Sequence, residues 1–200
     1  MVIERKNSKI VAESITLALI QLMEKKDFRG NIMLEQGDII IRCIEETDLE
    51  FVSFCASPTV YGAYQPFRFS SPAVLIGDYQ SGAMWNADGG ILLIEELGEA
   101  VGLAEVTLVR EGLARVGMIL LPDNRGCGIG TQALGMLRDY LADNYPVARI
   151  EADTDVENIA GQRILENNGF VCEGTMRCCR FYRGRYHDSY LYSYITELGR

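Results

Sequence analysis

The feature that most constrains the fold is a glycine-rich loop between an apolar segment and an amphipathic one. Residues 125–131 read Arg-Gly-Cys-Gly-Ile-Gly-Thr, so glycine recurs at alternate positions. Glycines let backbone N–H groups turn inward without Cβ clashes. The N-terminus of a following helix adds free donors and a partial positive charge. The loop therefore predicts a strand–turn–helix unit whose turn can cradle a phosphate or pyrophosphate.

Two other nucleotide-binding motifs fit this loop less well. A P-loop ends in Gly-Lys-Ser/Thr, whereas Gly130-Thr131 lacks the lysine. A dinucleotide fingerprint reads G-x-G-x-x-G, whereas this loop reads G-x-G-x-G before Thr131. Glu151 does stand about 20 residues on, where a ribose-binding acid is expected. However, the loop lies past the midpoint of the chain, which disfavours the dinucleotide interpretation.

Hydrophobic periodicity predicts an α/β (α+β) protein. Strands are expected at 39–44, 90–94, 100–109, 116–121 and 147–152, with a final pair of strands between 171 and 195. Helices are expected at 47–54, 131–144 and 158–168, and the segment 57–81 is expected to be irregular. Strands that bracket helices in this order are typical of a mixed sheet covered by helices.

The first 36 residues are expected to form an N-terminal helical extension, and residues 37–200 the main domain. Val11, Ile15 and Leu19 recur at helical spacing. Residues 8–28 resemble the first helix of TetR-type DNA-binding domains. The recognition helix that should follow is absent, because Gly37 already opens a strand. We expect this helix to pack on the domain or on a second copy in a homodimer.

Charge and composition narrow the class of partner. Nineteen Lys and Arg against 28 Asp and Glu give a net charge of −9, so no nucleic-acid partner is expected. No apolar stretch approaches the roughly 20 residues of a membrane span, and no signal-peptide pattern is present. We therefore expect a cytoplasmic protein without a membrane partner. The six cysteines lack CxxC spacing and His187 is the only histidine, so no metal centre is expected. Most cysteines are expected to be buried.

Three motifs in order resemble the GNAT superfamily of N-acetyltransferases. Residues 125–131 are similar to its acetyl-CoA pyrophosphate loop, and residues 158–170 resemble its motif N-x-x-S-x-x-x-L-E-K-x-G-F. Glu173-Gly174, residues 184–188 and Tyr192 are similar to the ending of the Rim-type branch, which includes ribosomal-protein and spermidine acetyltransferases. The resemblance runs from about residue 37 to 195. It implies a mostly antiparallel central sheet flanked by helices.

The resemblance also implies a reaction. An acetyl group would pass from acetyl-CoA to a primary amine, on a small molecule or a protein N-terminus, by direct attack on the thioester and without a metal. The acidic composition would suit a cationic amine. The alternative is a non-catalytic acyl-CoA-binding sensor, which the regulator-like first helix and the missing catalytic side chains favour.

By the same resemblance, the strand before the loop splays from its neighbour and pairs its backbone with the pantetheine arm. That pairing would fall on Ile119, Leu120 and Leu121, with the N–H of Leu120 placed to bind the oxyanion that develops on the thioester. Asn158 and Gly161 would line the pantetheine side, although Asn158 can also be a simple helix cap. The pyrophosphate would be held by Arg125, Gly126, Cys127, Gly128, Ile129, Gly130 and Thr131.

The general acid and base of the implied reaction are missing from their usual positions. Gly161 replaces a serine, Leu165 a tyrosine and Arg115 a glutamate of related sequences. Glu105 is the first candidate base, because burial in its apolar strand would favour the protonated carboxyl group. The alternative is a solvent-facing residue of an alternating strand. Glu151 and Asp153 are weaker candidates.

An aromatic segment is the candidate acceptor site. Clustered aromatics on a loop can line a substrate pocket, and they can equally plug the edge of a sheet. The residues concerned are Tyr61, Tyr64, Gln65, Phe67 and Phe69.

Overall fold

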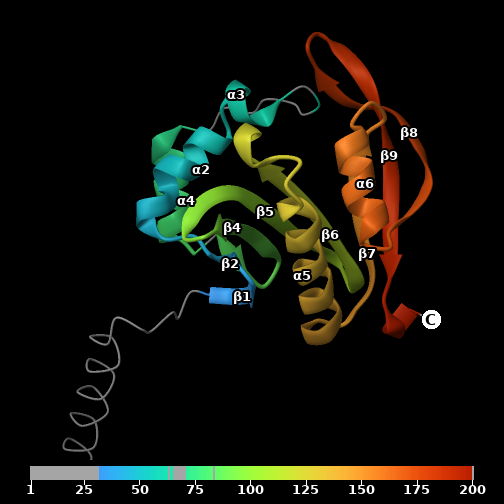
Figure 1. Cartoon of the computed structure of the whole chain (residues 1–200), viewed down its shortest axis with the longest axis horizontal. Coiled ribbons are helices and arrows are strands. Elements are labelled where there is room, and N and C mark those ends of the chain that lie inside the picture. Colours follow the sequence, from blue (N-terminus) through green and yellow to red (C-terminus); the bar gives the residue numbers. More distant parts are fainter. Residues whose placement is uncertain (1–31, 63, 65–70, 83, 200) are drawn as a thin grey trace, which may run out of the picture. The chain divides into compact units, whose positions relative to one another are not determined.

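The computed structural model describes residues 32–199, except residues 63, 65–70 and 83 (Figure 1). The helix expected at 8–28 lies outside this range, as do Gln65, Phe67 and Phe69 of the expected acceptor pocket. Within the described residues, no helix is long and apolar enough to cross a membrane. Nor do the described residues contain a group of three or more potential metal ligands.

The described strands form one mixed sheet. Its main path runs β1-β2-β4-β5-β6-β7-β9-β8, and β3 pairs with β4 at one side. All neighbouring strands are antiparallel except β6 and β7, which are parallel. The predicted mostly antiparallel α/β architecture is therefore confirmed. The strands are β1 (Ile32–Gln36), β2 (Ile39–Cys43), β3 (Trp85–Asn86), β4 (Gly89–Glu96), β5 (Glu99–Arg110), β6 (Gly112–Leu120), β7 (Val147–Asp155), β8 (Val171–Tyr182) and β9 (Arg185–Ile195).

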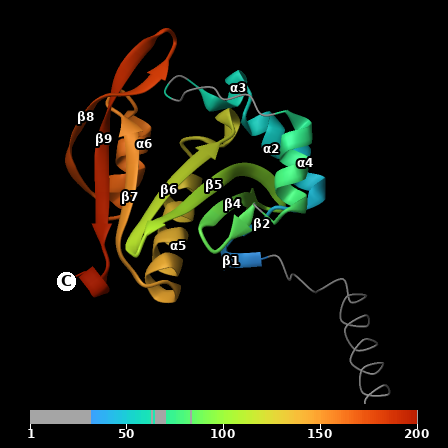
Figure 2. The ribbon, with the colours of Figure 1, turned by 180° about the vertical axis from the view of Figure 1, so that it is seen from behind.

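Helices cover both faces of the sheet (Figures 1 and 2). Because successive side chains of a strand point to opposite faces, Leu92 of β4 packs in one core and its neighbour Leu93 in the other. The first core lies beneath α5 (Ile129–Asn144) and α6 (Ile159–Asn167). The second lies beneath α2 (Leu49–Cys55), α3 (Pro58–Tyr61) and α4 (Pro72–Gln80). Short 3-10 helices are η1 (Glu46–Asp48), η2 (Pro122–Asn124) and η3 (Glu197–Gly199).

Two expectations about local structure need correction. The segment 57–81 is not wholly irregular, because α4 occupies residues 72–80. Ser71 accepts a hydrogen bond from the Val74 N–H and Pro72 occupies the first turn, a capping signal that the composition of the segment obscured. The sheet also begins earlier than residue 37, since β1 pairs with β2 through Gln36 opposite Ile39.

The expected burial of most cysteines is wrong. Only Cys55 is buried, Cys43 is half-buried, and the other four are exposed. Cys127 lies in the glycine-rich loop, and Cys172, Cys178 and Cys179 lie on β8. Because β8 is the edge strand of the sheet and has a neighbour on one side alone, most of its side chains meet solvent.

Candidate active site

Strands β6 and β7 separate before they end. Their register runs from Gly112 opposite Val147 to Arg115 opposite Glu151 and stops there. On its other side β6 continues to pair with β5 as far as Leu120 opposite Gly102. The last five residues of β6 therefore have no partner on β7, and the two strand backbones diverge there, as the resemblance implied (Figure 2). This gap between the two backbones is called the opening below.

The register with β5 determines which residues of β6 direct their backbone N–H and carbonyl groups toward this opening. The Leu121 N–H donates to the Val101 carbonyl at 2.9 Å, so odd-numbered residues of β6 direct their backbone to β5 and even-numbered residues to β7. Met118 and Leu120 therefore present backbone groups to the opening. Ile119 and Leu121 present theirs to β5. The sequence did not indicate Met118. Backbone groups of successive strand residues point in opposite directions, but the sequence alone does not say whether the even-numbered or the odd-numbered residues point toward the opening.

The glycine-rich loop follows directly. Gly126 and Gly128 have φ values of 79° and 93°, in the left-handed region that favours glycine, and Gly128 is the N-cap of α5. From Gly126 to Gly130, no backbone N–H donates to another part of the chain that the structure describes. Several N–H donors thus converge at a helix N-terminus, which is the arrangement that binds phosphate groups.

The side chain of Arg125 is bound to two backbone carbonyls. Its Nε donates to the Leu120 carbonyl at 2.9 Å, and one terminal nitrogen donates to the Val60 carbonyl at 2.5 Å. The guanidinium therefore ties the end of β6 to α3. Both acceptors are neutral carbonyls, so the positive charge stays uncompensated, and contact of Arg125 with a pyrophosphate stays a prediction.

Gly130 lies at a close contact between α5, α6 and β6. A Cβ at this position would lie 2.9 Å from Ile164 Cδ1 of α6 and 3.4 Å from Leu120 Cδ1. The glycine therefore lets α5, α6 and β6 approach one another closely, next to the opening. Thr131, one residue further on, is half-buried, and its carbonyl accepts a hydrogen bond from Asn168 at 3.0 Å.

Asn158 is the N-cap of α6. Its Oδ1 accepts the Gly161 N–H at 3.1 Å, and its Nδ2 donates to Thr154 Oγ1 at 3.0 Å. The capping interpretation is thereby confirmed, and contact with a cofactor stays a proposal. Gly161 lies against the same pair of side chains, since a Cβ there would stand 2.5 Å from Thr154 Oγ1.

Glu105 does not have the buried environment that its selection as a base assumed. Its side chain is exposed, opposite Gly117 on β6, and Oε2 stands 4.0 Å from the point where a Cβ of residue 117 would lie. The carboxylate thus borders β6 on the face opposite α5. Its catalytic role stays a hypothesis.

The weaker candidates are engaged in ion pairs. Glu151 binds Arg149 at 2.9 Å and Arg115 at 3.1 Å. Burial opposes ionisation, but the hydrogen bonds from these two arginines outweigh it and lower the pKa of Glu151. Asp153 pairs with Arg180. The lowered pKa makes the Glu151 carboxylate a poor general base.

The β8–β9 hairpin is anchored beside the opening. The Tyr182 hydroxyl donates to Asp155 Oδ2 at 2.6 Å, and the Tyr182 and His187 rings stack with centroids 3.6 Å apart. Burial of the Tyr182 hydroxyl raises its pKa, and the hydrogen bond to Asp155 raises it further. Because β8 is parallel to β7, the hairpin turn projects from the edge where the opening is widest.

The expected acceptor residues are described only in part. Tyr61 ends α3, and Tyr64 is half-buried in the segment after it. The hydrogen bond of Arg125 to Val60 connects α3 to the end of β6. This end of the sheet therefore brings together the start of the aromatic segment and the opening.

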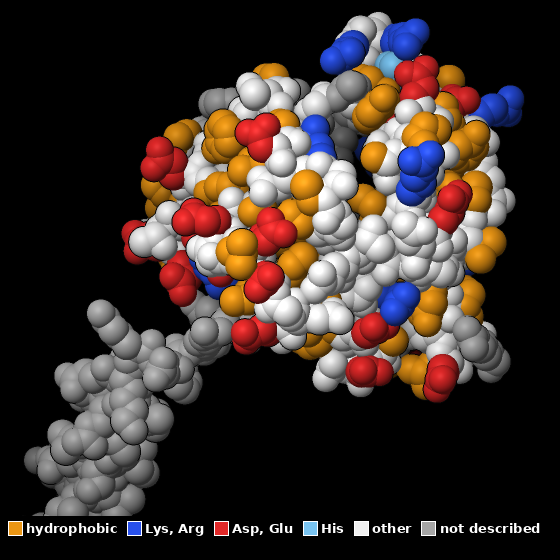
Figure 3. Space-filling view, viewed as in Figure 1, with side chains coloured by type: hydrophobic (Ala, Val, Ile, Leu, Met, Phe, Trp, Pro, Cys, Tyr) orange, Lys and Arg blue, Asp and Glu red, His pale blue; other side chains and the backbone are white. Residues whose placement is uncertain are grey.

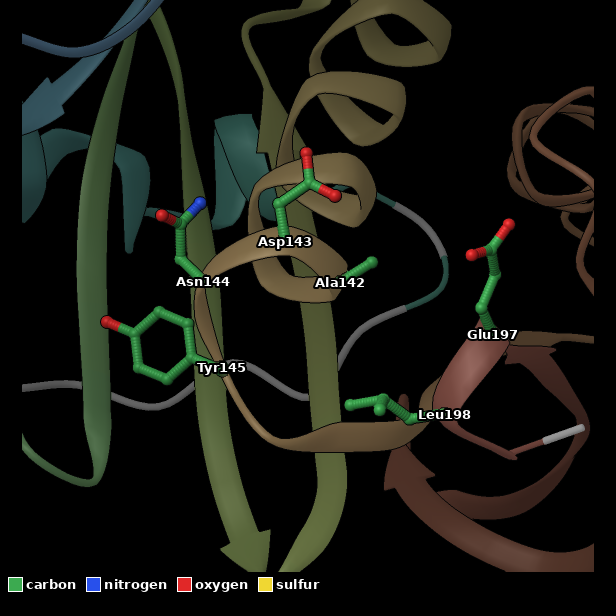
Figure 4. A pocket seen from close by; sticks show the side chains of 6 residues that line it. All are labelled: Ala142, Asp143, Asn144, Tyr145, Glu197 and Leu198. Carbon is green, nitrogen blue, oxygen red and sulfur yellow. The ribbon is translucent and has the colours of Figure 1, made fainter.

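Two surface hollows lie outside the opening, and one of them borders the glycine-rich loop. One of about 490 Å³ is formed by the C-terminal end of α5 together with η3, and its lining residues come from these two segments (Figure 4). It contains none of the predicted site residues. A second, of about 290 Å³, borders the loop at Cys127 and Gly128 but extends toward the β1–β2 turn at Asp38. Neither hollow follows the opening between β6 and β7.

Comparisons with known proteins give consistent results. The family model described as acetyltransferase (GNAT) domain matches residues 38–171. The chain is 27% identical over 108 residues to the "Uncharacterized N-acetyltransferase p20" of Bacillus licheniformis, covering 53% of this chain and 61% of that protein. It is 30% identical over 84 residues to the ribosomal-protein-serine acetyltransferase of Escherichia coli, covering 42% and 47% respectively. The aligned parts thus span less than two thirds of either relative.

Solved structures share the fold. The ribosomal L7/L12 alpha-N-protein acetyltransferase RimL, in complex with coenzyme A, aligns with a TM-score of 0.72 and 20% identity over 84% of this chain and 99% of its own. Spermidine N-acetyltransferase from Vibrio cholerae, in complex with CoA and spermine, aligns with a TM-score of 0.72 and 20% identity. The alignment covers 82% of this chain and 99% of that protein's chain. Since the family model covers well over half of the sequence, and the sheet separates where the family pattern requires, the chain belongs to the acetyltransferase (GNAT) domain family.

Proposed function

We propose that this protein is an acetyl-CoA-dependent N-acetyltransferase that acts on a primary amine by direct attack on the thioester. The observation that carries the proposal is the opening between β6 and β7, where the N–H and carbonyl of Met118 and the N–H of Leu120 have no strand partner among the described residues. The Leu120 carbonyl is occupied by Arg125. A free strand edge suits an extended, amide-containing chain such as pantetheine, because the two can exchange backbone hydrogen bonds.

The residues present fit acetyl-CoA in two further respects. The loop offers N–H donors at a helix N-terminus for a pyrophosphate. At Gly126 and Gly128, no described atom lies within 4 Å of the point where a Cβ would stand, so the approach to the loop is open. Acetyl-CoA, when bound, supplies the activated acetyl group. The Leu120 N–H is the proposed donor to the thioester carbonyl, where it would stabilise the charge that develops during attack.

Glu105 is the proposed base. Glu105 is paired with Gly117 of β6, and Gly102 is paired with Leu120. Glu105 is therefore three residues away from Gly102 along β5. That separation is about 10 Å along a strand, too far for direct proton transfer to an amine at Leu120. We therefore propose that Glu105 takes the proton through water. Its exposure keeps the carboxylate accessible to such a chain.

The acceptor is proposed to be a primary amine, and net charge is a poor guide to its class. Although the chain is acidic overall, four arginines lie between residues 177 and 185 on the β8–β9 hairpin (Figure 3). Of these, Arg177, Arg183 and Arg185 are exposed and pair with no carboxylate of the described residues, whereas Arg180 pairs with Asp153. An acceptor screen should therefore contain polyamines and also N-terminal peptides, both basic and acidic.

Calorimetric titration with acetyl-CoA, with coenzyme A and NAD as controls, tests the cofactor assignment. We expect micromolar binding of acetyl-CoA and none of NAD. Gly128→Ala should weaken binding at least tenfold, because an alanine at φ 93° distorts the loop. Gly98→Ala in the turn between β4 and β5 is the matched control, because Gly98 has a φ of 83° and no described atom within 4 Å of the point where its Cβ would stand. If neither acetyl-CoA nor coenzyme A binds, the assignment is wrong.

Thiol release from acetyl-CoA with the amine screen then separates an enzyme from a sensor. The sensor alternative is favoured by the absence of a proton donor at Gly161 and Leu165. An enzyme releases coenzyme A only when a suitable amine is present. A protein that binds acetyl-CoA tightly but releases no thiol with any amine would be a sensor.

A further inference from the structure

Thr154 is a buried residue on the part of β7 that lies beyond its last pairing with β6. It is 7% exposed and ends a row of buried β7 residues, Ile150 and Ala152, that faces the core under α5 and α6. The last paired residues of the parallel strands β6 and β7 are Arg115 and Glu151. Met118 lies three residues beyond Arg115 on β6, and Thr154 lies three residues beyond Glu151 on β7. The hydroxyl is therefore level with Met118 on the opposite side of the opening.

The hydroxyl proton of Thr154 has no assigned acceptor. Asn158 Nδ2 donates to Thr154 Oγ1 at 3.0 Å, so the oxygen acts as the acceptor in that hydrogen bond. Asn158 Oδ1 is occupied by the Gly161 N–H. None of the described residues accepts a hydrogen bond from Thr154, and a buried O–H is normally satisfied. The hydroxyl proton of Thr154 thus has no acceptor among the described residues, which leaves this donor for a bound molecule.

Gly161 and Thr154 form a matched pair. A Cβ at residue 161 would lie 2.5 Å from Thr154 Oγ1 and 2.7 Å from Asn158 Nδ2. Real Cβ atoms do not approach so closely, so the threonine hydroxyl occupies the space that a side chain on residue 161 would need. A serine at 161 combined with alanine at 154 would bring a hydroxyl to nearly the same place from the other element.

We propose that Thr154 is a catalytic residue that donates a hydrogen bond to the sulfur atom of the thioester as it departs. This inference rests on the proposed acetyltransferase function. The new C–N bond forms, the C–S bond breaks, and its electron pair goes to sulfur, while the amine proton passes to water or the base. Threonine keeps its proton throughout and stabilises the thiolate by hydrogen bonding alone. Burial strengthens such a bond because water does not compete.

Thr154→Val, Thr154→Ser and Thr154→Ala test the role of the hydroxyl. We expect kcat to fall about 10- to 100-fold in Thr154→Val, a loss comparable to or below that of an oxyanion-hole donor. The Kd for acetyl-CoA, measured by calorimetry, should change less than about threefold. Thr154→Ser should keep kcat within about threefold of the parent. Retention of full kcat by a folded Thr154→Val protein would overturn the inference.

A double variant that moves the hydroxyl from residue 154 to residue 161 is the decisive test. Gly161→Ser alone should lower thermal stability because of the short contacts with Thr154 and Asn158, of which the contact with Asn158 remains in the double variant. Thr154→Ala alone should lower kcat. The double variant Thr154→Ala/Gly161→Ser should recover kcat at least fivefold over Thr154→Ala. A purely structural role for Thr154 predicts no such recovery, so kcat equal to that of Thr154→Ala in a folded double variant would overturn the inference.

The parent protein separates this inference from the proposed function. If the parent binds acetyl-CoA but acetylates no amine of the screen, the proposed function and the inference both fail. If the parent is active and the Thr154 variants match it, only the inference fails. Circular dichroism melting curves recorded on every variant identify losses of activity that arise from unfolding.

Discussion

The Arg125 guanidinium donates its Nε–H to the Leu120 carbonyl at 2.9 Å. The first residue of the glycine-rich loop thereby holds the last peptide of β6, and through Val60 it also holds α3. Because a peptide group is planar, fixing a carbonyl of this strand end restricts the orientation of the neighbouring N–H groups. The loop and the strand edge are thus mechanically connected.

We expect Arg125→Ala to lower kcat/KM for acetyl-CoA about tenfold. Hydrogen bonds from a charged donor contribute roughly 1.5–3 kcal/mol each, and part exposure reduces that value here. Steady-state kinetics on the parent and variant measure the effect. Arg110→Ala, an exposed arginine at the far end of β5, is the control and should leave the kinetics unchanged. Equal kinetics for Arg125→Ala and the parent would show that this anchor does not matter for the cofactor site.

Gly130→Ala should destabilise the protein by about 1–3 kcal/mol, because its methyl group would press on Ile164 and Leu120 in a packed interface. Urea unfolding followed by circular dichroism measures the change. Gly77→Ala in α4 is the matched control. No described atom lies within 4 Å of the point where its Cβ would stand, and alanine is favoured over glycine in a helix interior by roughly 1 kcal/mol. The two substitutions should therefore have opposite signs, and a stabilising Gly130→Ala would contradict the packing argument.

Glu105→Gln tests the proposed base. If the carboxylate removes the amine proton, kcat/KM should fall at least tenfold, and its dependence on pH should change because one titrating group is gone. The pH–rate profiles of parent and variant measure this with an amine from the screen. Glu111→Gln, in the turn between β5 and β6, serves as the control. Full activity of Glu105→Gln across the pH range would show that positioning alone drives the reaction.

The Arg149–Glu173 pair predicts a pH dependence of stability. Two hydrogen bonds of 2.6 Å from Arg149, with a third from Ser193, lower the pKa of Glu173 from 4.5 to about 2. A carboxyl group with a depressed pKa stabilises the fold above its unfolded-state value and loses that contribution as pH falls. The stabilisation is therefore complete above about pH 4.5 and disappears toward pH 2.

Melting temperatures of the parent and Glu173→Gln measure this effect. The parent should be the more stable at pH 6, and the difference should vanish by about pH 2. Ser193→Ala, which removes a single hydrogen bond to the same carboxylate, should show a smaller change in the same pH range. Because the side chains of the pair are partly exposed, added salt should reduce the difference. A difference that does not vary between pH 6 and pH 2 would contradict the assignment.

Several motif residues at the C-terminal end have structural roles that their sequence pattern alone does not specify. Glu173 binds Arg149, and the Asp188 carboxylate accepts the Cys178 N–H at 2.8 Å. The Tyr192 hydroxyl donates to Glu166 at 3.1 Å, and burial together with this bond raises the pKa of Tyr192 to about 12. These contacts hold β8, β9 and α6 together beside the opening.

Local order was accessible from the sequence because its signals are local. The helices at 129–144 and 159–167 follow apolar spacing and caps within a few residues, and the strands at 39–43 and 147–155 follow apolar runs between turn residues. The glycine-rich loop was likewise recognisable from residues 125–131, because left-handed backbone geometry and helix N-terminal donors depend on adjacent residues. Family membership followed from the order of such local motifs.

The tertiary structure decided every feature that depends on pairing between distant segments. The register between β6 and β5 decides that the backbone N–H of Leu120, and not that of Ile119, points toward the opening. Glu105 is exposed because of the face of the sheet on which its side chain lies. The position of Thr154 beside Gly161 depends on how α6 packs on β7. A one-residue change of register would reverse each of these assignments. Register arises from long-range packing that a single sequence does not display.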